Sequence, residues 1–330
     1  MTDSVIGIDI GGTKTAAALI TGTGEIAYLI QKPTCQEGPD KGIRQITDLI
    51  DDILLIANNK KSNISGIGIG IPAALEKETD RILWAPNIQG WKNVELKDHL
   101  EDKYHLPAGI EYDGHAAVLG EWWLGKGKGK QSIVDIVIGT GIGSGAIIDG
   151  HLLQGANRLA GAIGWQVLAK RIKMTDQQDQ KIGFWENLAA GPGIADFANQ
   201  TLSPDEIKYI SGTKQKIDSK QLFEASKQGY KPAQDITAQV TEWLGIGIAN
   251  VISILNPEIV ILGGSVGTAC DFLLPDIQRI SKTWSQPVSG QTAQIVISDL
   301  GTNAGLLGAA FGILMRLKNE SKKFINGGEK

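Results

Sequence analysis

The residues from Asp9 to Lys14 are the first in the chain whose types and spacing have an evident chemistry. Asp9 ends an apolar run, the pair Gly11 and Gly12 follows, and Thr13 and Lys14 come next. Adjacent glycines allow positive φ and let bare backbone N–H groups approach an anion. A carboxylate beside them suits a divalent ion that bridges phosphates. The pattern predicts a phosphate-binding turn in a β-hairpin, although a plain Gly-Gly hairpin with an exposed aspartate has the same residues.

Two further glycine segments repeat this chemistry. One follows an apolar run at 132–138, and the other, the pair Gly263 and Gly264, follows an apolar run at 258–262. Glycine turns at strand ends suit a nucleotide that lies across the C-terminal ends of strands. Two similar hairpins, one in each half, predict a duplicated architecture with a phosphate held between the halves. The residues of the second turn are Gly139, Thr140, Gly141, Gly143 and Gly145.

Asp113 lies between a predicted strand, 108–112, and an evident helix. An aspartate in this position can cap the helix by accepting a bond from a backbone N–H of the first turn. It can also act as a general base that takes the proton of an alcohol during phosphoryl transfer. Position alone favours the cap.

Two other polar residues are candidates for substrate contact. Asn87 lies in a long polar loop that follows the predicted strand 64–71, where a substrate wall or a plain surface excursion would both fit. Glu186 opens a predicted helix, as a dipole partner in the first turn or as a ligand group. The histidines are scattered without ligand spacing, so the sequence predicts no protein metal cage. They are His99, His105, His115 and His151.

The elements that must position these residues follow from hydrophobic periodicity and turn signals. Strands are expected at 6–20 as a hairpin, then at 25–30, 64–71, 108–112, 132–153 as a second hairpin, 258–262 and 295–298. Helices are expected at 42–58, 96–104, from 114 onward, 233–255 and 305–317. Strands and helices therefore alternate along the chain, which predicts an α/β protein.

Composition sets the class of protein. The chain has 330 residues and a net charge of -4, enough for two domains and without a charge bias toward nucleic acid or membranes. Cys35 and Cys270 have no metal or redox spacing, which suits reduced thiols in the cytoplasm. No signal segment and no 18-residue apolar run are recognised. The expectation is a cytoplasmic enzyme with neither a nucleic-acid nor a membrane partner.

Six segments in order resemble the ROK family (repressors, open reading frames and sugar kinases), from about Val5 to Phe311. They are DIGGTKT, EYDGHAA, GTGIGSGAIIDGHLLQG, AGAIGW, AAGPGI and NPEIVILGG. The resemblance implies the actin-like ATPase fold, two α/β domains with a ribonuclease H-like core around a cleft. It also implies a homodimer that phosphorylates a sugar with ATP and Mg²⁺. The expected domains are residues 1–113, completed by the helix 305–330, and residues 114–304.

The resemblance also assigns roles to single residues. Asp113 matches the catalytic base, and Asp9 is a candidate ligand for the Mg²⁺ that ATP brings. The first phosphate segment would be Asp9, Gly11, Gly12 and Thr13, with Lys14 beside it, and the second Thr140, Gly141, Gly143 and Gly145. Gly263 and Gly264 would contact the adenosine. The expected substrate contacts are Asn87, Tyr112, Asp113, Ala162, Trp165 and Glu186.

Some of these positions depart from the family pattern. Tyr112 replaces the usual Asn before the catalytic Asp, and Ala162 and Trp165 replace the Glu and His of GExGH. The usual cysteine-rich CxCGxxGCxE segment keeps its Gly183 and Glu186 but has Gln177, Asp179 and Phe184 where cysteines stand. All four zinc ligands are replaced together, so no structural zinc is expected. The sugar is left open among hexoses, N-acetylhexosamines and polyols, because matched polar groups set such selectivity.

Two other functions compete with a kinase. Sugar-responsive regulators of the family carry a helix-turn-helix segment ahead of the first strand, and only four residues precede Val5. A catalytically weak or inactive protein that binds sugar or nucleotide is the second alternative, because Tyr112, Ala162 and Trp165 all alter the sugar site. Against that alternative, Asp113 and all three glycine segments are retained.

Overall fold

A computed structural model of the chain describes residues 4–168, 183–213 and 215–326, with side chains up to residue 319 in the last helix. The chain packs into two compact units. The first comprises Met1–Lys128, Leu152–Ala160 and Thr302–Lys330, and the second comprises Gly129–His151 and Gly161–Gly301. The boundary expected at residue 113 falls inside the first unit.

Five strands form the central sheet of the first unit: β1 (Ser4–Ile10), β2 (Lys14–Thr21), β3 (Ile26–Pro33), β4 (Ile64–Ile71) and β8 (Ala108–Tyr112). Their order is β3-β2-β1-β4-β8. The first three strands form an antiparallel meander, whereas β4 and β8 lie parallel to β1. The C-terminal ends of β1, β4 and β8 therefore lie at one edge of the sheet.

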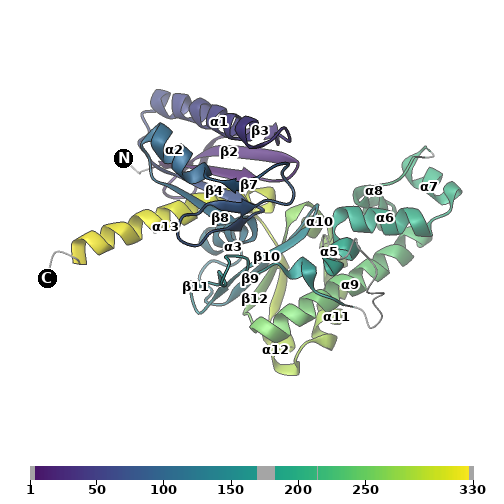
Figure 1. Cartoon of the computed structure of the whole chain (residues 1–330). Helices are drawn as coiled ribbons and strands as arrows, with labels where there is room; N and C mark the ends of the chain where they lie inside the picture. Colours follow the sequence, from purple (N-terminus) through teal and green to yellow (C-terminus); the bar gives the residue numbers. More distant parts are fainter. Residues whose placement is uncertain (1–3, 169–182, 214, 327–330) are drawn as a thin grey trace. The chain divides into compact units, whose positions relative to one another are not determined.

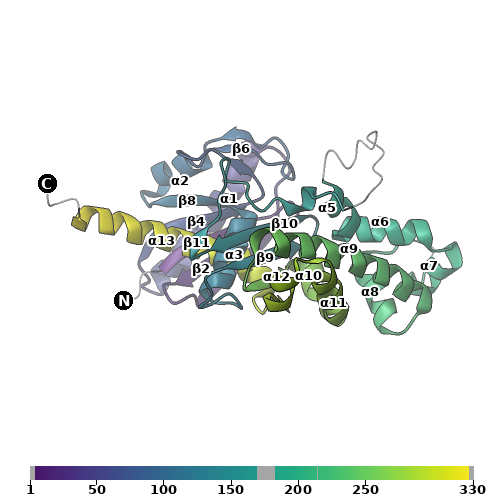
Figure 2. The same ribbon diagram turned by 90° about the horizontal axis from the view of Figure 1, so that it is seen from below.

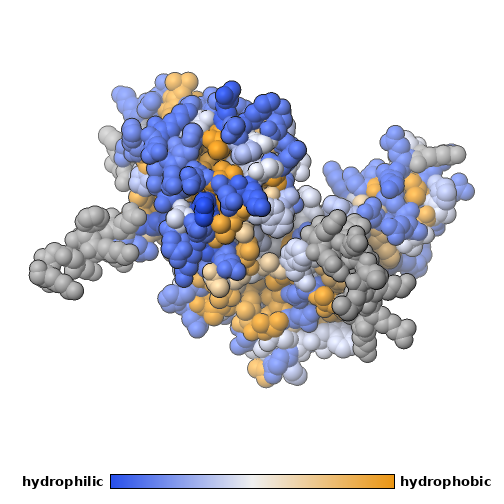
Figure 3. Space-filling model, viewed as in Figure 1, coloured by the Kyte–Doolittle hydropathy of each residue, from blue (hydrophilic) through white to orange (hydrophobic). Residues whose placement is uncertain are grey.

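Helices cover both faces of this sheet: α1 (Pro39–Asn59), α2 (Leu96–Tyr104), α3 (Asp113–Trp123) and α13 (Ala304–Asn326). The apolar sides of α1 and α2 pack on one face, and α3 and α13 pack on the other (Figures 1 and 2). The outer surface over α1 and α2 is predominantly hydrophilic (Figure 3), as expected of amphipathic helices.

The alternation of isoleucine and glycine in β4 explains this layering. Successive side chains of a strand point to opposite faces, so Ile67 and Ile69 enter the core beneath α1. Gly68 points the other way, where a Cβ atom would lie 1.9 Å from the carbonyl oxygen of Ala309. The backbone of α13 therefore lies directly on the sheet.

The long loop after β4 contains three short strands that the sequence analysis did not predict. They are β5 (Ala74–Leu75), β6 (Ile82–Trp84) and β7 (Lys92–Val94), and they form a small antiparallel sheet of their own. Strands of two or three residues are too short for a periodicity to reveal.

The second unit has a sheet of the same design. Its strands are β9 (Ile133–Ile138), β10 (Ile142–Ile148), β11 (His151–Leu152), β12 (Ile259–Gly263) and β13 (Gln294–Ile297). The order is β11-β10-β9-β12-β13, with β9 and β10 antiparallel and β12 and β13 parallel to β9. Each strand thus has a counterpart in the first sheet, and the predicted duplication is confirmed.

The helices of the second unit pack against its sheet and against one another. They are α5 (Phe184–Ala189), α6 (Gly191–Thr201), α7 (Pro204–Ser211), α8 (Ser219–Lys227), α9 (Lys231–Leu255), α10 (Gly264–Ala269), α11 (Leu274–Trp284) and α12 (Pro287–Thr292). Short 3₁₀ turns lie at Ile163–Trp165, Asp271–Leu273 and Gly301–Asn303. In the described part of the chain, α9 has the length and composition that a membrane span would need. Half of that apolar stretch is buried inside the protein, as in a core helix.

Candidate active site

Asp9 and Asp113 lie at the same edge of the first sheet. Asp9 is aligned with Gly70 of β4, and Tyr112, the residue before Asp113, is aligned with Ile71. Burial and the negative charge of Asp113 raise the pKa of Asp9 to about 7, against the opposing charge of Lys14. Burial also raises the pKa of Asp113 to about 6. The structure therefore brings together two carboxyl groups that titrate near neutral pH.

The surroundings of Asp9 are glycines. A Cβ atom on Gly305, in the first turn of α13, would lie 3.3 Å from the carboxyl carbon of Asp9, and one on Gly70 would lie 3.8 Å from its Oδ1. The missing side chains leave the Asp9 carboxylate room beside the N-terminus of a long helix, where an anion or its counter-ion can approach.

Asp113 is the first residue of α3, and Tyr112 occupies the cap position. The reading of Asp113 as the N-cap residue is therefore wrong by one position. Its Oδ1 does accept a hydrogen bond of 2.8 Å from the N–H of Gly114. This bond holds the carboxylate at the start of the helix and lowers its pKa. Burial raises the pKa by more, so the pKa is raised overall.

The first glycine turn has a different geometry from the one the sequence suggested. Gly11 donates its N–H to the carbonyl of Lys14 at 2.9 Å, which closes a tight turn. Neither Gly11 nor Gly12 is among the residues with positive φ. The glycine is needed instead for close approach, because a Cβ atom on Gly12 would lie 3.1 Å from the Cβ of Asn87.

Gln36 joins this turn to the loop that carries Asn87, a role that the sequence analysis missed. Its Nε2 donates to the carbonyl of Gly12 at 2.6 Å and to that of Asn87 at 3.3 Å, and its Oε1 accepts the N–H of Gln89 at 2.9 Å. Asn87 and Thr13 are both exposed at this place. The first glycine turn and the loop of Asn87 are thus one connected surface in the first unit.

Tyr112 is buried, and its ring lies edge-on to the imidazole of His115 with centroids 5.2 Å apart. His115 is fully buried, and its Nε2 lies 2.9 Å from the carbonyl oxygen of Ala160. Burial lowers the pKa of His115, so a neutral ring donates this bond. His115 therefore packs inside the first unit.

The second and third glycine segments meet in the second unit. Gly264 has φ of +78°, and a Cβ atom on it would lie 2.4 Å from the carbonyl oxygen of Ile138. One on Gly139 would lie 3.7 Å from the Oγ of Ser265. The N–H of Gly191, the first residue of α6, donates to the carbonyl of Gly139 at 2.8 Å. The β9–β10 turn is therefore enclosed by the starts of two helices, a setting suited to phosphate.

Glu186 supports the same turn. Its Oε2 accepts the N–H of Ile142 at 2.8 Å, and a Cβ atom on Gly141 would lie 2.6 Å from that oxygen. Gly164 also lies near this carboxylate, since a Cβ atom on it would lie 3.2 Å from Oε2. Glu186 thus joins the β9–β10 turn to the segment that contains Ala162 and Trp165.

Ala162 precedes a 3₁₀ turn beside β10, and Trp165 is the last residue of that turn. Gly161 has φ of +105° and accepts hydrogen bonds from the N–H and the hydroxyl of Ser144, at 2.8 and 3.0 Å. This contact anchors the segment, while Trp165 keeps 51% of its surface exposed. Gln177 and Asp179 lie outside the described residues, so the absence of a zinc site stays a prediction. Among the residues that the structure describes, no three His, Cys, Asp or Glu side chains are grouped to hold a metal ion.

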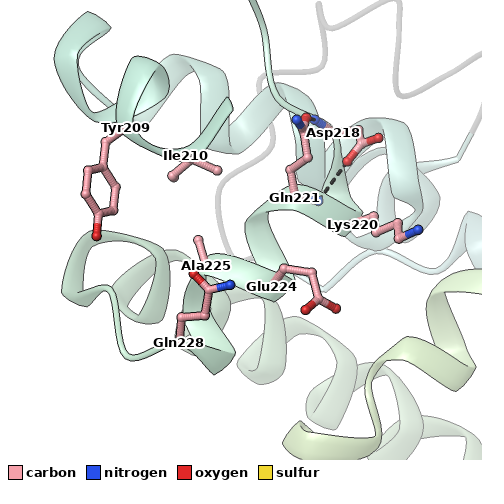
Figure 4. Close-up of a pocket in the computed structure, with 8 residues that line it drawn as sticks. All are labelled: Tyr209, Ile210, Asp218, Lys220, Gln221, Glu224, Ala225 and Gln228. Atoms are coloured by element: carbon pink, nitrogen blue, oxygen red, sulfur yellow. Dashed lines mark hydrogen bonds between the residues drawn. The ribbon is translucent and has the colours of Figure 1, made fainter. Parts of the chain in front are cut away.

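A hollow of about 550 Å³ between α7 and α8 lies apart from these segments. Figure 4 shows its polar lining, in which Asp218 accepts the N–H of Gln221 to cap α8. None of the residues that line it comes from a glycine turn or from the sheet edges.

Comparison with known proteins connects these residues to a family. A glucokinase from Halalkalibacterium halodurans is 32% identical over 96% of this chain and 97% of its own. A xylose repressor from Caldicellulosiruptor bescii is 30% identical over 92% of this chain and 76% of its own. The crystal structure of a ROK family glucokinase from Streptomyces griseus in complex with glucose and AMPPNP is 28% identical, with a TM-score of 0.78 over 93% of this chain and 98% of that one.

These likenesses confirm the predicted actin-like ATPase fold. The model of the ROK family matches residues 5–315. The chain therefore belongs to the ROK family.

Proposed function

We propose that the chain is an ATP-dependent carbohydrate kinase that transfers the γ-phosphoryl group to a sugar hydroxyl, with Asp113 as the general base. The observation that carries the proposal is the pair Asp9 and Asp113 at one sheet edge, next to a glycine turn. Two relatives that match this chain over more than nine tenths of both sequences are named glucokinases.

In this mechanism Asp113 accepts the proton of the sugar hydroxyl while the hydroxyl oxygen attacks the γ-phosphorus. The new oxygen–phosphorus bond forms as the bond to the ADP oxygen breaks, and ADP leaves. A pKa of about 6 leaves Asp113 mostly ionised at neutral pH and still basic enough to take the proton.

Asp9 fits a role toward Mg²⁺. Burial and the negative charge of Asp113 make an ionised carboxylate at this position unfavourable, and the positive charge of Lys14 offsets this only in part. A Mg²⁺ ion bound with the ATP phosphates would supply that positive charge and neutralise the developing charge of the leaving group. Thr13 and the N–H groups of the first turn would contact the phosphates, and Lys14 contributes a positive charge nearby.

In the second unit, the turn with Thr140, Gly141, Gly143 and Gly145 would hold phosphate oxygens, and Gly263 and Gly264 would contact the adenosine. The helix starts at Gly191 and Gly264 beside this turn support this assignment. The substrate contacts proposed are Asn87, Tyr112, Ala162, Trp165 and Glu186.

The substrate class is a hexose, an N-acetylhexosamine or a related polyol. Ala162 and Trp165 provide no carboxylate or imidazole for substrate hydroxyls, and the half-exposed Trp165 ring offers an apolar face. Discrimination by buried polar groups is strong, so we expect a preference that differs from that of glucokinases. A cytoplasmic homodimer without nucleic-acid or membrane partners remains a prediction.

A sugar- or nucleotide-binding regulator without turnover is the alternative function. The same three replacements, Tyr112, Ala162 and Trp165, favour it, and the family includes proteins named xylose repressors. ADP release from Mg-ATP over a panel of hexoses, N-acetylhexosamines and polyols distinguishes the two. Turnover with one compound that Asp113→Asn abolishes supports the kinase. Sugar-dependent stabilisation without any ADP release supports the regulator.

A further inference from the structure

Two arginines and two acidic residues form a closed ring of ion pairs in the first unit. Arg158 and Arg316 each contact both Asp80 and Glu111. The Nη2 atoms lie 2.7 Å (Arg158) and 2.6 Å (Arg316) from the two carboxylate oxygens of Glu111. Asp80, Glu111 and Arg158 are buried. The ring is neutral as a whole, which is the condition under which buried charges are tolerated.

The ring completes the edge of the sheet at Ile110 of β8. The Ile110 carbonyl accepts hydrogen bonds from Arg158 Nη2 at 2.8 Å and Arg316 Nη2 at 3.1 Å, and its N–H donates to Asp80 Oδ2 at 3.3 Å. Since β8 is the last strand in the order, these backbone groups have no neighbouring strand on that side. Side chains therefore supply the hydrogen bonds that a further strand would give.

Four segments remote in sequence meet in the ring. Asp80 lies in the turn between β5 and β6, Glu111 in β8, Arg158 in the segment 152–160, and Arg316 in α13. Asp80 and Arg158 have φ of 60° and 53°, which non-glycine residues adopt at a cost in free energy. Such conformations persist where surrounding contacts hold them, and here the contacts are those of the ring.

The ring is linked to the residues that precede and follow Asp113 in the sequence. Glu111 lies two residues before Asp113. Ala160 lies two residues after Arg158, and its carbonyl accepts a hydrogen bond from His115, two residues after Asp113. The strand end that precedes Asp113 and the helical turn that follows it are thus both attached to the ring.

We propose that Arg158 and Arg316 are positioning residues that fix the direction of the Asp113 carboxylate. The proposal rests on the function of Asp113 proposed above. A guanidinium fork contacts two carboxylates and a carbonyl at once, whereas an ammonium group keeps the charge without this fixed geometry. Arg→Lys variants therefore test the geometry separately from the charge.

The variants are Arg158→Lys, the partly exposed Arg316→Lys, and the double variant Asp80→Asn/Arg158→Gln, which removes one charge of each sign. The control is Arg279→Lys, in an exposed pair with Asp276 on α11. Misplacement of a reacting group by about 1 Å can cost ~100-fold in rate. We expect kcat to fall ~10–100-fold with KM for Mg-ATP within about threefold, and no change in the control. A kcat that falls only in proportion to lost folded protein would overturn the proposal.

A second readout does not need sugar turnover. The ¹³Cγ resonance of Asp113, assigned by its loss in Asp113→Asn, should titrate near pH 6 in the wild type. In the ring variants we expect its midpoint to fall toward the ordinary value, because water reaches a loosened carboxylate. Since Asp9 titrates nearby, the comparison is repeated with Asp9→Asn. An unchanged midpoint in every ring variant contradicts the positioning role, even if the wild type phosphorylates nothing and the kinase proposal fails.

Discussion

Burial and the negative charge of Asp113 raise the pKa of Asp9, although Asp9 lies in β1 and Asp113 follows β8. The strand between them, β4, places Gly70 beside Asp9, so no side chain at that position separates the carboxylates. The ionised Asp113 therefore disfavours the ionised form of Asp9 in the absence of a cation. In the ligand-free protein this repulsion helps to hold the pKa of Asp9 above its ordinary value, and the binding of Mg-ATP would change that pKa.

The rate should depend on pH through both carboxyl groups. Because Asp113 must be ionised to act as a base, kcat should fall as the pH drops below about 6. Mg²⁺ bound at Asp9 would hold that carboxylate ionised, so the group with pKa about 7 should affect kcat/KM for Mg-ATP but not kcat. Steady-state profiles from pH 5 to 8.5 check this. The Asp9→Asn variant should lack the upper step, and a flat profile would contradict the assignment.

The stability of the ligand-free protein should fall as the pH rises, whereas kcat should rise. Both folded-state pKa values lie above the ordinary value of 3.8, so the protonated forms stabilise the fold at low pH. That contribution is lost as the pH rises from about 4, where the unfolded chain ionises, to about 6 and 7, where the folded protein does. Asn resembles the protonated acid, so Asp9→Asn should be more stable than the wild type at pH 8, by ~1–3 kcal/mol, and the gain should be clearly smaller at pH 5. Denaturant unfolding at both pH values measures this difference.

The matched control for that measurement is Asp276→Asn, on the exposed surface of α11. It should show no pH-dependent gain. Equal stability of Asp9→Asn and the wild type at pH 8 would show that the carboxylate is well solvated in solution.

Gln36 should couple the phosphate turn to the loop of Asn87. Gln36→Ala removes the hydrogen bonds to Gly12 and to the loop, and Gln36 is exposed, so we expect little loss of stability. Looser positioning should lower kcat/KM for the sugar by ~3–30-fold. The comparison is with Gln239→Ala, a partly exposed glutamine on α9 whose amide donates to Glu242. An unchanged kcat/KM would mean that the two loops act independently.

Glu186 should affect nucleotide binding through the second turn. Glu186→Ala removes the acceptor for the N–H of Ile142, whereas Glu186→Gln keeps an acceptor oxygen. We expect the affinity for a non-hydrolysable ATP analogue to fall ~10-fold in Glu186→Ala and less in Glu186→Gln, since one charge-assisted hydrogen bond is lost. Titration calorimetry measures both. Unchanged nucleotide affinity with a raised KM for sugar would assign Glu186 to the substrate alone.

Much of the fold could be predicted because local sequence patterns mark its core elements. The structure gives β4, α2 and β8 the predicted limits, since an apolar run between turn signals marks each of them. Positive φ, one of the two reasons predicted for glycine at position 12, is not found there. The sequence shows that a side chain is absent but does not show how closely Asn87 approaches.

The parts that escaped prediction depend on pairings across long sequence separations. Arg158 and Glu111 are 47 residues apart, and Arg316 and Asp80 are 236 apart. No periodicity marks such partners, and a charged residue in a loop is normally expected at the surface. Gln36 escaped for the same reason, because its partners Gly12 and Asn87 lie on other loops.

The most direct test of the kinase proposal is detection of the phosphorylated product itself. Mass spectrometry would follow each sugar of the panel after incubation with Mg-ATP and the wild-type protein, in parallel with Asp113→Asn. The proposal predicts one sugar that gains a single phosphoryl group with the wild type, at a rate ~10²–10⁴-fold lower with the variant. Product formed equally fast by both proteins, or no phosphorylated sugar while the protein binds ATP and sugar, would contradict it.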